Sequence, residues 1–313
     1  MRALVTGGAG FIGSHIATRL VESGHTVRVL DDLSSGKKEN LAQIAGEVEL
    51  VVGDVRDARK VAELSAGCDV VFHEAAIVSV PYSVEHPFET HDVNIEGTLN
   101  VLQAASAQRV KRVVFACSAA VYGEEPEQPK VETMRPAPVA PYGVEKITGE
   151  QYMYCWSRLY GVETVSLRYF NVFGPRQDPS SPYSGVISIF VDRILRGAPI
   201  TIFGDGEQYR DFVYVDNVVD ANLAAATRPN VSGRAYNVGC GRKTSLNELV
   251  ATLARIVGRD VRPTHADPRP GDIRESLADI SRARAELGYE PKIGVEEGLR
   301  RLVDSVSEAV GRF

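Results

Sequence analysis

The sequence predicts an α/β fold in which a doubly wound parallel sheet is combined with a smaller, interleaved α/β lobe. In the first half, short runs rich in β-branched residues alternate with segments whose apolar residues recur every three to four positions. A glycine-rich turn joins the first run to the first helical segment. After about residue 171, turn-rich segments separate further helical patterns. Strands that alternate with helices predict a parallel sheet with helices on both faces.

The individual elements follow from these patterns in chain order. Six strands are expected, at Ala3–Thr6, Thr26–Leu30, Val48–Val52, Val70–His73, Arg112–Cys117 and Val162–Leu167. Helices are expected between them at Phe11–Ser23, Ala58–Leu64, Glu89–Gln108 and Tyr142–Tyr160, and later at Val186–Leu195, Val215–Ala226, Leu246–Val257 and Val295–Val310. We therefore expect a Rossmann-type domain over residues 1–170 and a ligand-binding lobe mainly over 171–313, with some segments returning to the first domain.

The composition excludes several classes of protein. The chain has 313 residues, 44% hydrophobic and 24% charged, which excludes a disordered or fibrous chain. The net charge is −6 and no run of Lys or Arg is longer than two residues, so a nucleic-acid or anionic-membrane partner is not expected. Apolar runs stay well below the roughly 20 residues that span a bilayer, and no signal-peptide pattern opens the chain. These features predict a cytoplasmic protein.

The residues that commonly bind metals show no ligand pattern. The four cysteines and six histidines are scattered without the spacing of a zinc site or a disulfide framework. We therefore expect buried, reduced thiols and a site that works without a metal ion.

The first chemical motif is the glycine-rich turn at Gly7–Gly13. It follows a strand and opens a helix, so its glycines would let backbone N–H groups approach a pyrophosphate at the helix N-terminus. Asp31 and Asp32 stand at the end of the second strand, about 20 residues further on, where a carboxylate accepts hydrogen bonds from a ribose. Such a carboxylate would repel a 2′-phosphate, which favours NAD over NADP. Asp54, after the third strand, is a candidate for hydrogen bonding the adenine.

The second motif consists of Ser118, Tyr142 and Lys146. Tyr142 and Lys146 are four residues apart and therefore one turn from each other on a helix. A phenol with a pKa near 10 is a poor base at neutral pH, but a neighbouring ammonium and an oxidised nicotinamide both favour phenolate. Ser118 follows an apolar strand, where ligands gather in open α/β sheets. We expect the three to act together as catalytic residues.

These motifs together resemble the extended short-chain dehydrogenase/reductase family, over essentially the whole chain. The shared features are T-G-G-A-G-F-I-G at Thr6–Gly13, the Y-x-x-x-K pair and the strand-end Ser118. The resemblance implies NAD as cofactor and carbonyl/alcohol chemistry. It also implies a set of cofactor-binding residues: Gly7, Gly10, Phe11, Ile12, Gly13, Asp31, Asp32, Ser35, Gly36, Asp54, Val55, Ala75, Ala76, Asn94, Tyr142, Lys146 and Tyr169. Asn94 matches the residue that supports the active-site helix, and Tyr169 the one beside the nicotinamide.

Other segments are similar to those of UDP-sugar 4-epimerases, namely Arg168–Pro179, Gly204–Gly206, Arg210–Phe212 and Arg269–Asp272. The resemblance implies a UDP-sugar substrate, inversion at the sugar 4-hydroxyl through a 4-keto intermediate, tightly bound NAD, and a homodimer. Asn171, Arg210 and Arg269 fall where the family binds the diphosphate, and guanidinium groups suit its oxygens. Phe203 matches the aromatic residue against uracil. The implied substrate contacts are Ser79, Ser118, Tyr142, Asn171, Val186, Ile187, Phe203, Arg210, Arg269 and Ser276.

Two details narrow the activity, and alternatives stay open. Ala119 and Ala120 replace the acidic pair of the dehydratase branch, which argues against loss of water. Ser276 stands where glucose/galactose enzymes often carry a bulky Tyr, so UDP-GlcNAc/UDP-GalNAc are expected beside UDP-glucose/UDP-galactose, unless Ser276 is only a surface residue. The alternatives are a UDP-glucuronate 4-epimerase or decarboxylase and, from another class, a catalytically silent NAD-sensing regulator.

Overall fold

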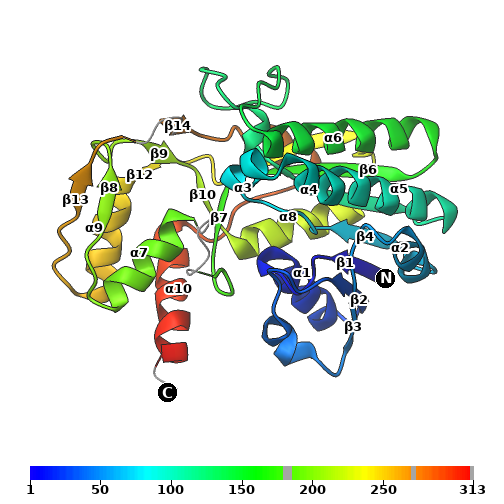
Figure 1. Cartoon of the computed structure of the whole chain (residues 1–313), viewed down its shortest axis with the longest axis horizontal. Coiled ribbons are helices and arrows are strands. Elements are labelled where there is room, and N and C mark those ends of the chain that lie inside the picture. The colour runs from blue at the N-terminus through cyan, green and yellow to red at the C-terminus, as the bar shows by residue number, and fades with distance from the viewer. Residues whose placement is uncertain (179–184, 269–272, 311–313) are drawn as a thin grey trace.

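Seven parallel strands form the centre of the larger lobe, on the right in Figure 1. The computed structural model describes residues 1–178, 185–268 and 273–310. The strands are β1 (Arg2–Thr6), β2 (Thr26–Asp31), β3 (Val48–Val52), β4 (Val70–His73), β5 (Arg112–Ser118), β6 (Glu163–Tyr169) and β11 (Arg234–Val238). Their order is β11-β6-β5-β4-β1-β2-β3, and every pair in the sheet is parallel. The predicted doubly wound fold is confirmed, with the strand order reversing between β1 and β4, where such sheets bind ligands.

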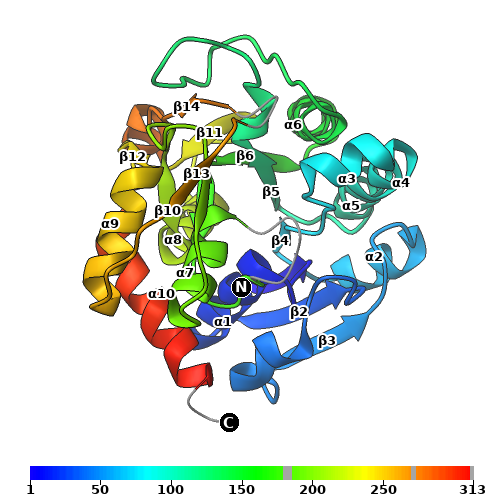
Figure 2. The same ribbon diagram turned by 60° about the vertical axis from the view of Figure 1, so that its left-hand side comes forward.

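Helices cover both faces of this sheet (Figure 2). On one face, α1 (Phe11–Glu22) packs against α8 (Val215–Thr227). On the other face lie α2 (Ala58–Ser65), α5 (Gly97–Ala107) and α6 (Pro141–Leu159). Because both faces are covered, most of β4 and of β5 forms continuous apolar runs rather than alternating ones, and these side chains are buried.

Each of the six predicted strands begins and ends within two residues of its predicted limits, whereas the helix predicted at Glu89–Gln108 is divided. The chain forms α4 (Pro87–His91), a π-helical turn η2 (Asp92–Glu96) and then α5. The wider turn has a cause in the tertiary structure, because Asn94 within it hydrogen-bonds to the loop after β4. The seventh strand of the sheet, β11, was not predicted. Three short helical elements of the first half also escaped prediction, because each has too few residues to show a period: η1 (Lys38–Ile44), α3 (Val80–Glu85) and η3 (Ala119–Val121).

The second half of the chain forms a smaller lobe with its own apolar core. Its helices are α7 (Val186–Leu195), α9 (Leu246–Val257) and α10 (Val295–Val310), as predicted. Its short strands are β7 (Asn171–Phe173), β8 (Thr201–Phe203), β9 (Tyr209–Arg210), β10 (Phe212–Tyr214), β12 (Thr244–Ser245), β13 (Thr264–Ala266) and β14 (Glu275–Ser276), and η4 (Ala283–Leu287) is a π-helical turn. The core includes Phe190, Leu249 and Leu302. Within the described ranges, no helix combines the length and apolarity required to span a membrane.

His73, at the end of β4, makes the stability of the fold dependent on acid. Its ring lies between the hydroxyls of Thr6 (2.8 Å) and Thr98 (2.9 Å), fully buried. Burial lowers its pKa from 6.5 to about 3. Below pH 6.5 the unfolded chain therefore takes up a proton that the folded chain cannot bind until about pH 3. The stability associated with neutral His73 is therefore fully present above the pKa of the unfolded chain, 6.5. It declines as the pH falls toward the pKa of the folded chain, about 3.

We expect the free energy of unfolding to fall by about 2 kcal/mol, on account of His73, between about pH 7 and about pH 5. Chemical denaturation at the two pH values measures it. In a His73→Asn variant the loss on acidification should be smaller by that amount, whereas the exposed His265→Asn control should behave as the native chain. An unchanged acid dependence in His73→Asn would contradict the assignment.

Candidate active site

The turn between β1 and α1 brings the backbone close to other segments. Gly7 has a φ of +67°, and a Cβ there would lie 2.7 Å from the backbone nitrogen of Ala75. A Cβ on Gly13 would overlap the carbonyl oxygen of Gly7. Gly10 is the N-cap of α1 and offers no side chain, so no side-chain cap occupies the helix N-terminus. The turn therefore fits a pyrophosphate, and the predicted contacts Gly7, Gly10, Phe11, Ile12 and Gly13 all lie in it.

Asp31, the last residue of β2, faces the glycine-rich turn. Its Oδ2 accepts a hydrogen bond from the Ala9 N–H (2.9 Å) and its Oδ1 from the Leu33 N–H (2.8 Å). Gly36 packs against this carboxylate, since a Cβ there would lie 2.5 Å from Oδ1. Each oxygen keeps a second lone pair that a ribose hydroxyl can use. Two other predicted contacts, Asp32 and Ser35, are exposed on the same loop.

Asp54 and Val55 follow β3, at the end predicted to hold the adenine. The carboxylate of Asp54 is paired with the Arg56 guanidinium (2.6 Å), and this hydrogen bond lowers its pKa. The Asp54 carboxylate thus already accepts hydrogen bonds from Arg56, and an adenine that hydrogen-bonds to it would do so in addition to Arg56. Val55 is buried against Gly97 at the start of α5.

Ser118, Tyr142 and Lys146 lie together at the carboxyl end of β5. Ser118 ends that strand, and its Oγ accepts a hydrogen bond from the Ala120 N–H (3.1 Å). Its hydroxyl lies close enough to the Tyr142 phenol to lower the pKa of that phenol. Lys146, one turn along α6 from Tyr142, donates to the carbonyl oxygen of Ala116 (2.8 Å). Its Nζ lies 5.8 Å from the centre of the Tyr142 ring. Residues from two separate elements are therefore brought together, with Tyr142 and Lys146 buried and Ser118 half-buried.

The surrounding protein does not make Tyr142 a stronger base. Burial raises the pKa of its phenol well above the ordinary value, the Ser118 hydrogen bond lowers it, and the charges of Glu145 and Glu74 raise it further. Burial also lowers the pKa of Lys146. Desolvation of the phenolate is the largest of these effects, so Tyr142 needs added positive charge to act as a base. That Lys146 and an oxidised nicotinamide together supply this charge stays a prediction.

Asn94 supports the catalytic helix through a residue that the sequence reasoning missed. Its Nδ2 donates to Glu145 Oε2 (2.6 Å) and to the Ile77 carbonyl (3.0 Å), while its Oδ1 accepts from the Ile77 N–H (2.8 Å). Thr90 Oγ1 donates to the other oxygen of Glu145 (2.7 Å). The buried Glu145 thus connects α6 to the loop after β4. Its place between Tyr142 and Lys146 in the sequence was the available signal.

A second missed group is the buried ion pair of Arg168, on β6, with Glu150, on α6. Two hydrogen bonds join them, Nη2 to Oε1 (2.6 Å) and Nε to Oε2 (2.8 Å), and their side chains are only 4% and 9% exposed. Arg168 also donates to the Tyr122 hydroxyl (2.9 Å), which donates to Asn237 Oδ1 (2.6 Å) on β11. The pair attaches the catalytic helix to the sheet.

The loop after β4 carries three more predicted contacts. Ala75 and Ala76 are half-buried beside the glycine-rich turn, and Ala75 N–H points to Thr6 Oγ1 at 3.4 Å. Ser79 is buried and caps α3, because its Oγ accepts a hydrogen bond from the Tyr82 N–H (3.0 Å). Capping of α3 therefore explains the position of the Ser79 hydroxyl even if no substrate contacts it.

In the smaller lobe, the structure brings Arg210 and Ser276 side by side. β14 pairs with β9 in parallel, and Ser276 stands opposite Arg210. Asp211, which follows Arg210 in the chain, is fully buried. Its carboxylate accepts hydrogen bonds from the N–H groups of Cys240 (2.7 Å), Gly241 (2.8 Å) and Ala278 (3.2 Å). Asp211 thus ties the Arg210 strand to the segments after β11 and around Ser276.

The remaining predicted substrate contacts occupy separate elements of this lobe. Asn171 begins β7, which pairs with β10, and Phe203 ends β8. Val186 and Ile187 begin α7; the side chain of Ile187 lies in the lobe's core, so a ligand could reach only its backbone. Arg269 lies outside the described residues.

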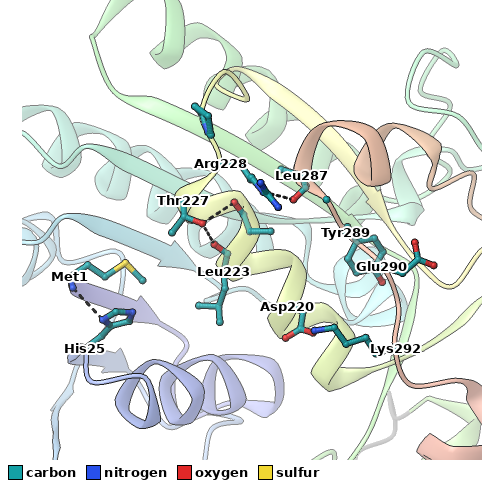
Figure 3. A pocket seen from close by; sticks show the side chains of 13 residues that line it. Met1, His25, Asp220, Leu223, Thr227, Arg228, Leu287, Tyr289, Glu290 and Lys292 are labelled. Atoms are coloured by element: carbon teal, nitrogen blue, oxygen red, sulfur yellow. Dashed lines mark hydrogen bonds and ion pairs between the residues drawn. The ribbon is translucent and has the colours of Figure 1, made fainter.

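A cavity of about 540 Å³ lies elsewhere, at the amino ends of β1 and β2 (Figure 3). Its polar groups are already paired: the Met1 amino group with His25 Nδ1 (3.2 Å), Lys292 with Asp220 (2.8 Å), and Arg228 with the Leu287 carbonyl (2.9 Å). The groups predicted to be catalytic lie at the opposite, carboxyl ends of the strands, so this cavity is separate from them.

The doubly wound sheet, the glycine-rich helix start and the Ser-Tyr-Lys group define a nicotinamide-dependent enzyme of the short-chain dehydrogenase type. The model of the NAD dependent epimerase/dehydratase family matches residues 3–239. The chain belongs to this family, and its cofactor is NAD.

Individual relatives are similar to this chain over nearly its whole length. A UDP-glucose 4-epimerase from Mycolicibacterium smegmatis is 42% identical over 308 residues, covering 97% of this chain and 98% of the relative. The crystal structure of UDP-glucose 4-epimerase from Thermotoga maritima with UDP-glucose superposes with a TM-score of 0.94 at 41% identity, covering 99% and 100% of the two chains. A UDP-N-acetylglucosamine 4-epimerase from Methanobrevibacter ruminantium, in complex with UDP-N-acetylmuramic acid, also has a TM-score of 0.94, at 39% identity and 98% coverage of both chains.

Proposed function

We propose that the protein is a UDP-sugar 4-epimerase that keeps NAD bound through each turnover. The observation that carries the proposal is the group of Ser118, Tyr142 and Lys146 at the carboxyl end of β5, together with a glycine-rich turn that fits a pyrophosphate. The relatives described above, similar over nearly their full length, support the same activity.

In this proposal each residue of the group has one task. Tyr142 removes the proton from the sugar 4-hydroxyl, and Ser118 hydrogen-bonds to both the substrate oxygen and the phenol. Lys146 holds the ribose and helps to keep the phenol deprotonated. NAD, when bound, would supply the hydride acceptor and donor for carbon 4, while the residues that hold the diphosphate would leave the 4-keto sugar free to turn and present its opposite face. Tyr142 then returns the proton, so no net oxidation occurs.

The raised pKa of Tyr142 means that the site requires a nearby positive charge. Because burial raises that pKa, a positive charge must compensate before the phenol can act as a base near neutral pH. Lys146 is the protein's own cation in this group, and the oxidised nicotinamide adds a second positive charge. We therefore expect Tyr142 to become an effective base only when oxidised cofactor is bound.

The choice of sugar depends on the space around the hexose. Ala119 and Ala120 follow Ser118, and Ser276 lies beside Arg210, so small residues stand near the expected position of the sugar. Arg210, predicted to bind the diphosphate, would hold the UDP portion while leaving the hexose free to turn. We propose UDP-glucose and UDP-galactose as substrates, with UDP-GlcNAc and UDP-GalNAc accepted because Ser276 leaves room for an acetamido group.

Retention of NAD is supported by a contact across the cofactor turn. Lys37 donates its backbone N–H to the Ala9 carbonyl (2.9 Å), and its ammonium pairs with Asp178 (2.6 Å) from the segment that leads into the smaller lobe. Asn40 Nδ2 also donates to the Ala9 carbonyl (2.8 Å). These contacts connect the loop after β2 to both the glycine-rich turn and the other lobe, which would hinder release of the cofactor.

The outer face of α6 supports the proposed homodimer. Val144, Tyr154 and Leu159 on this helix are 49%, 50% and 73% exposed, and Phe88 on the nearby α4 is 87% exposed. Apolar side chains exposed to this extent along one region are typical of a surface that another chain covers. We propose that a second copy packs there.

An NMR assay distinguishes the substrates. Purified protein without added NAD should convert UDP-glucose, and also UDP-GlcNAc, to products with an axial 4-hydroxyl, and should act poorly on UDP-glucuronate. Failure to form such a product from any of the three would overturn the epimerase proposal. Conversion of UDP-glucuronate alone would establish the uronate alternative instead.

A further inference from the structure

The carboxylate of Glu74 occupies a place in the site that the proposed mechanism does not use. Glu74 follows β4 directly, and its backbone lies against the glycine-rich turn, since a Cβ on Gly7 would be 2.9 Å from its carbonyl carbon. The Tyr169 hydroxyl donates a hydrogen bond to Glu74 Oε1 (2.8 Å). Asn222 Nδ2, on α8, in turn donates to that hydroxyl (2.8 Å). This chain of donors presents a proton to Glu74 and keeps its carboxylate an acceptor.

Glu74 also interacts electrostatically with Lys146 and Tyr142, since β4 and β5 end at the same side of the sheet. Its charge raises the pKa of Lys146 and of Tyr142, and the charge of Lys146 lowers the pKa of Glu74. Burial, the largest effect, raises the pKa of Glu74 from 4.5 to about 7, so the carboxylate is ionised in mildly alkaline solution. The neighbouring His73 stays neutral. Glu74 therefore adds a negative charge close to Lys146.

We propose that Glu74 is a positioning residue whose negative charge, held in place by Tyr169, favours the oxidised over the reduced form of the bound nicotinamide. The inference rests on the proposed function, in which Tyr169, Tyr142 and Lys146 surround the nicotinamide. Oxidised nicotinamide carries a positive charge that the reduced ring lacks, so a nearby carboxylate stabilises only the oxidised form. The hydride is then returned readily to the 4-keto sugar, and the enzyme spends little time in the reduced state.

Two variants separate the charge of Glu74 from its hydrogen bond. Glu74→Gln removes the charge but keeps an oxygen that accepts from Tyr169. Tyr169→Phe removes the hydrogen bond but keeps the charge. The holoprotein is equilibrated with excess UDP-glucose at a pH well above 7, and the reduced fraction of its cofactor is read from the near-ultraviolet absorbance of reduced nicotinamide.

In Glu74→Gln the ratio of reduced to oxidised cofactor should rise roughly three- to tenfold over the native ratio. The charge-conserving Glu74→Asp should stay near the native ratio. Tyr169→Phe, which releases the carboxylate and alters a predicted cofactor contact but keeps the charge, should raise the ratio less than Glu74→Gln does. An unchanged ratio in Glu74→Gln would overturn the proposal, as would an equal rise in Tyr169→Phe, which would assign the effect to the hydrogen bond. Should the native protein reduce no cofactor and form no epimer with any UDP-sugar, the proposed function itself would fail, and that outcome is separate from the first two.

Discussion

Replacing Tyr142 by phenylalanine should lower turnover about 10²- to 10⁴-fold, the range that a positioned acid or base contributes. The phenol is the group aimed at the substrate hydroxyl in the proposed mechanism, and Ser118 and Lys146 act on the substrate oxygen partly through it. The ring itself remains in Tyr142→Phe, so packing around α6 is retained. Conversion of UDP-glucose measured by NMR gives the turnover, and absorbance of the purified protein shows whether NAD remains bound.

Tyr154 provides the matched control for this change. It lies on the same helix but is 50% exposed and away from Ser118, so Tyr154→Phe should leave turnover near the native value. Near-normal turnover in Tyr142→Phe would remove Tyr142 as the base. Loss of NAD from that variant would instead show that the phenol serves mainly to bind the cofactor.

Breaking the buried pair of Arg168 and Glu150 should destabilise the fold by about 3 to 5 kcal/mol, because removing one partner leaves an uncompensated charge in a desolvated position. In Arg168→Met, the Glu150 carboxylate loses both hydrogen bonds from Arg168. It then keeps the weak hydrogen bond that the Cys117 thiol donates (3.4 Å). The free energy of unfolding from chemical denaturation measures the effect. The burial of both side chains makes this the largest expected change in stability.

Two further variants make the result interpretable. The double variant Arg168→Met with Glu150→Leu removes both charges and should recover most of the lost stability, because an apolar pair of similar volume is often as stable as a buried ion pair. The exposed pair Arg59–Glu63, with side chains 89% and 62% exposed, is the control, and Arg59→Met should cost less than about 1 kcal/mol. Equal losses at the two pairs would show that burial does not govern the energy of the Arg168–Glu150 pair.

Both predictions concern the same helix, at different points along its length. Tyr142 and Lys146 use the end of α6 that lies beside Ser118, whereas Glu150, two turns from Tyr142, holds the helix to β6. Glu145 adds a third attachment through Asn94. The position of the base therefore depends on buried polar contacts that take no part in the chemistry.

The sequence by itself determined the fold class and the order of the main elements. The strands were recognisable because those buried on both faces are continuous apolar runs, as Val70–Phe72 and Val113–Cys117 are. The glycine-rich turn, Asp31 and the Tyr142–Lys146 pair could be located in the same way, because helix starts, strand ends and one helical turn are local features. The short strands β8, β9 and β12–β14 could not, since two or three residues carry no period.

Only the tertiary structure decided which distant residues meet and what their surroundings do to them. Arg168 with Glu150, Asn94 with Glu145, and Glu74 with Tyr169 are pairs whose partners come from different elements, and spacing along the chain carries no information about them. The pKa of Tyr142 is the clearest case. The sequence shows a neighbouring lysine, which should lower that pKa, whereas burial of the phenol raises it, and burial exists only once the chain has folded.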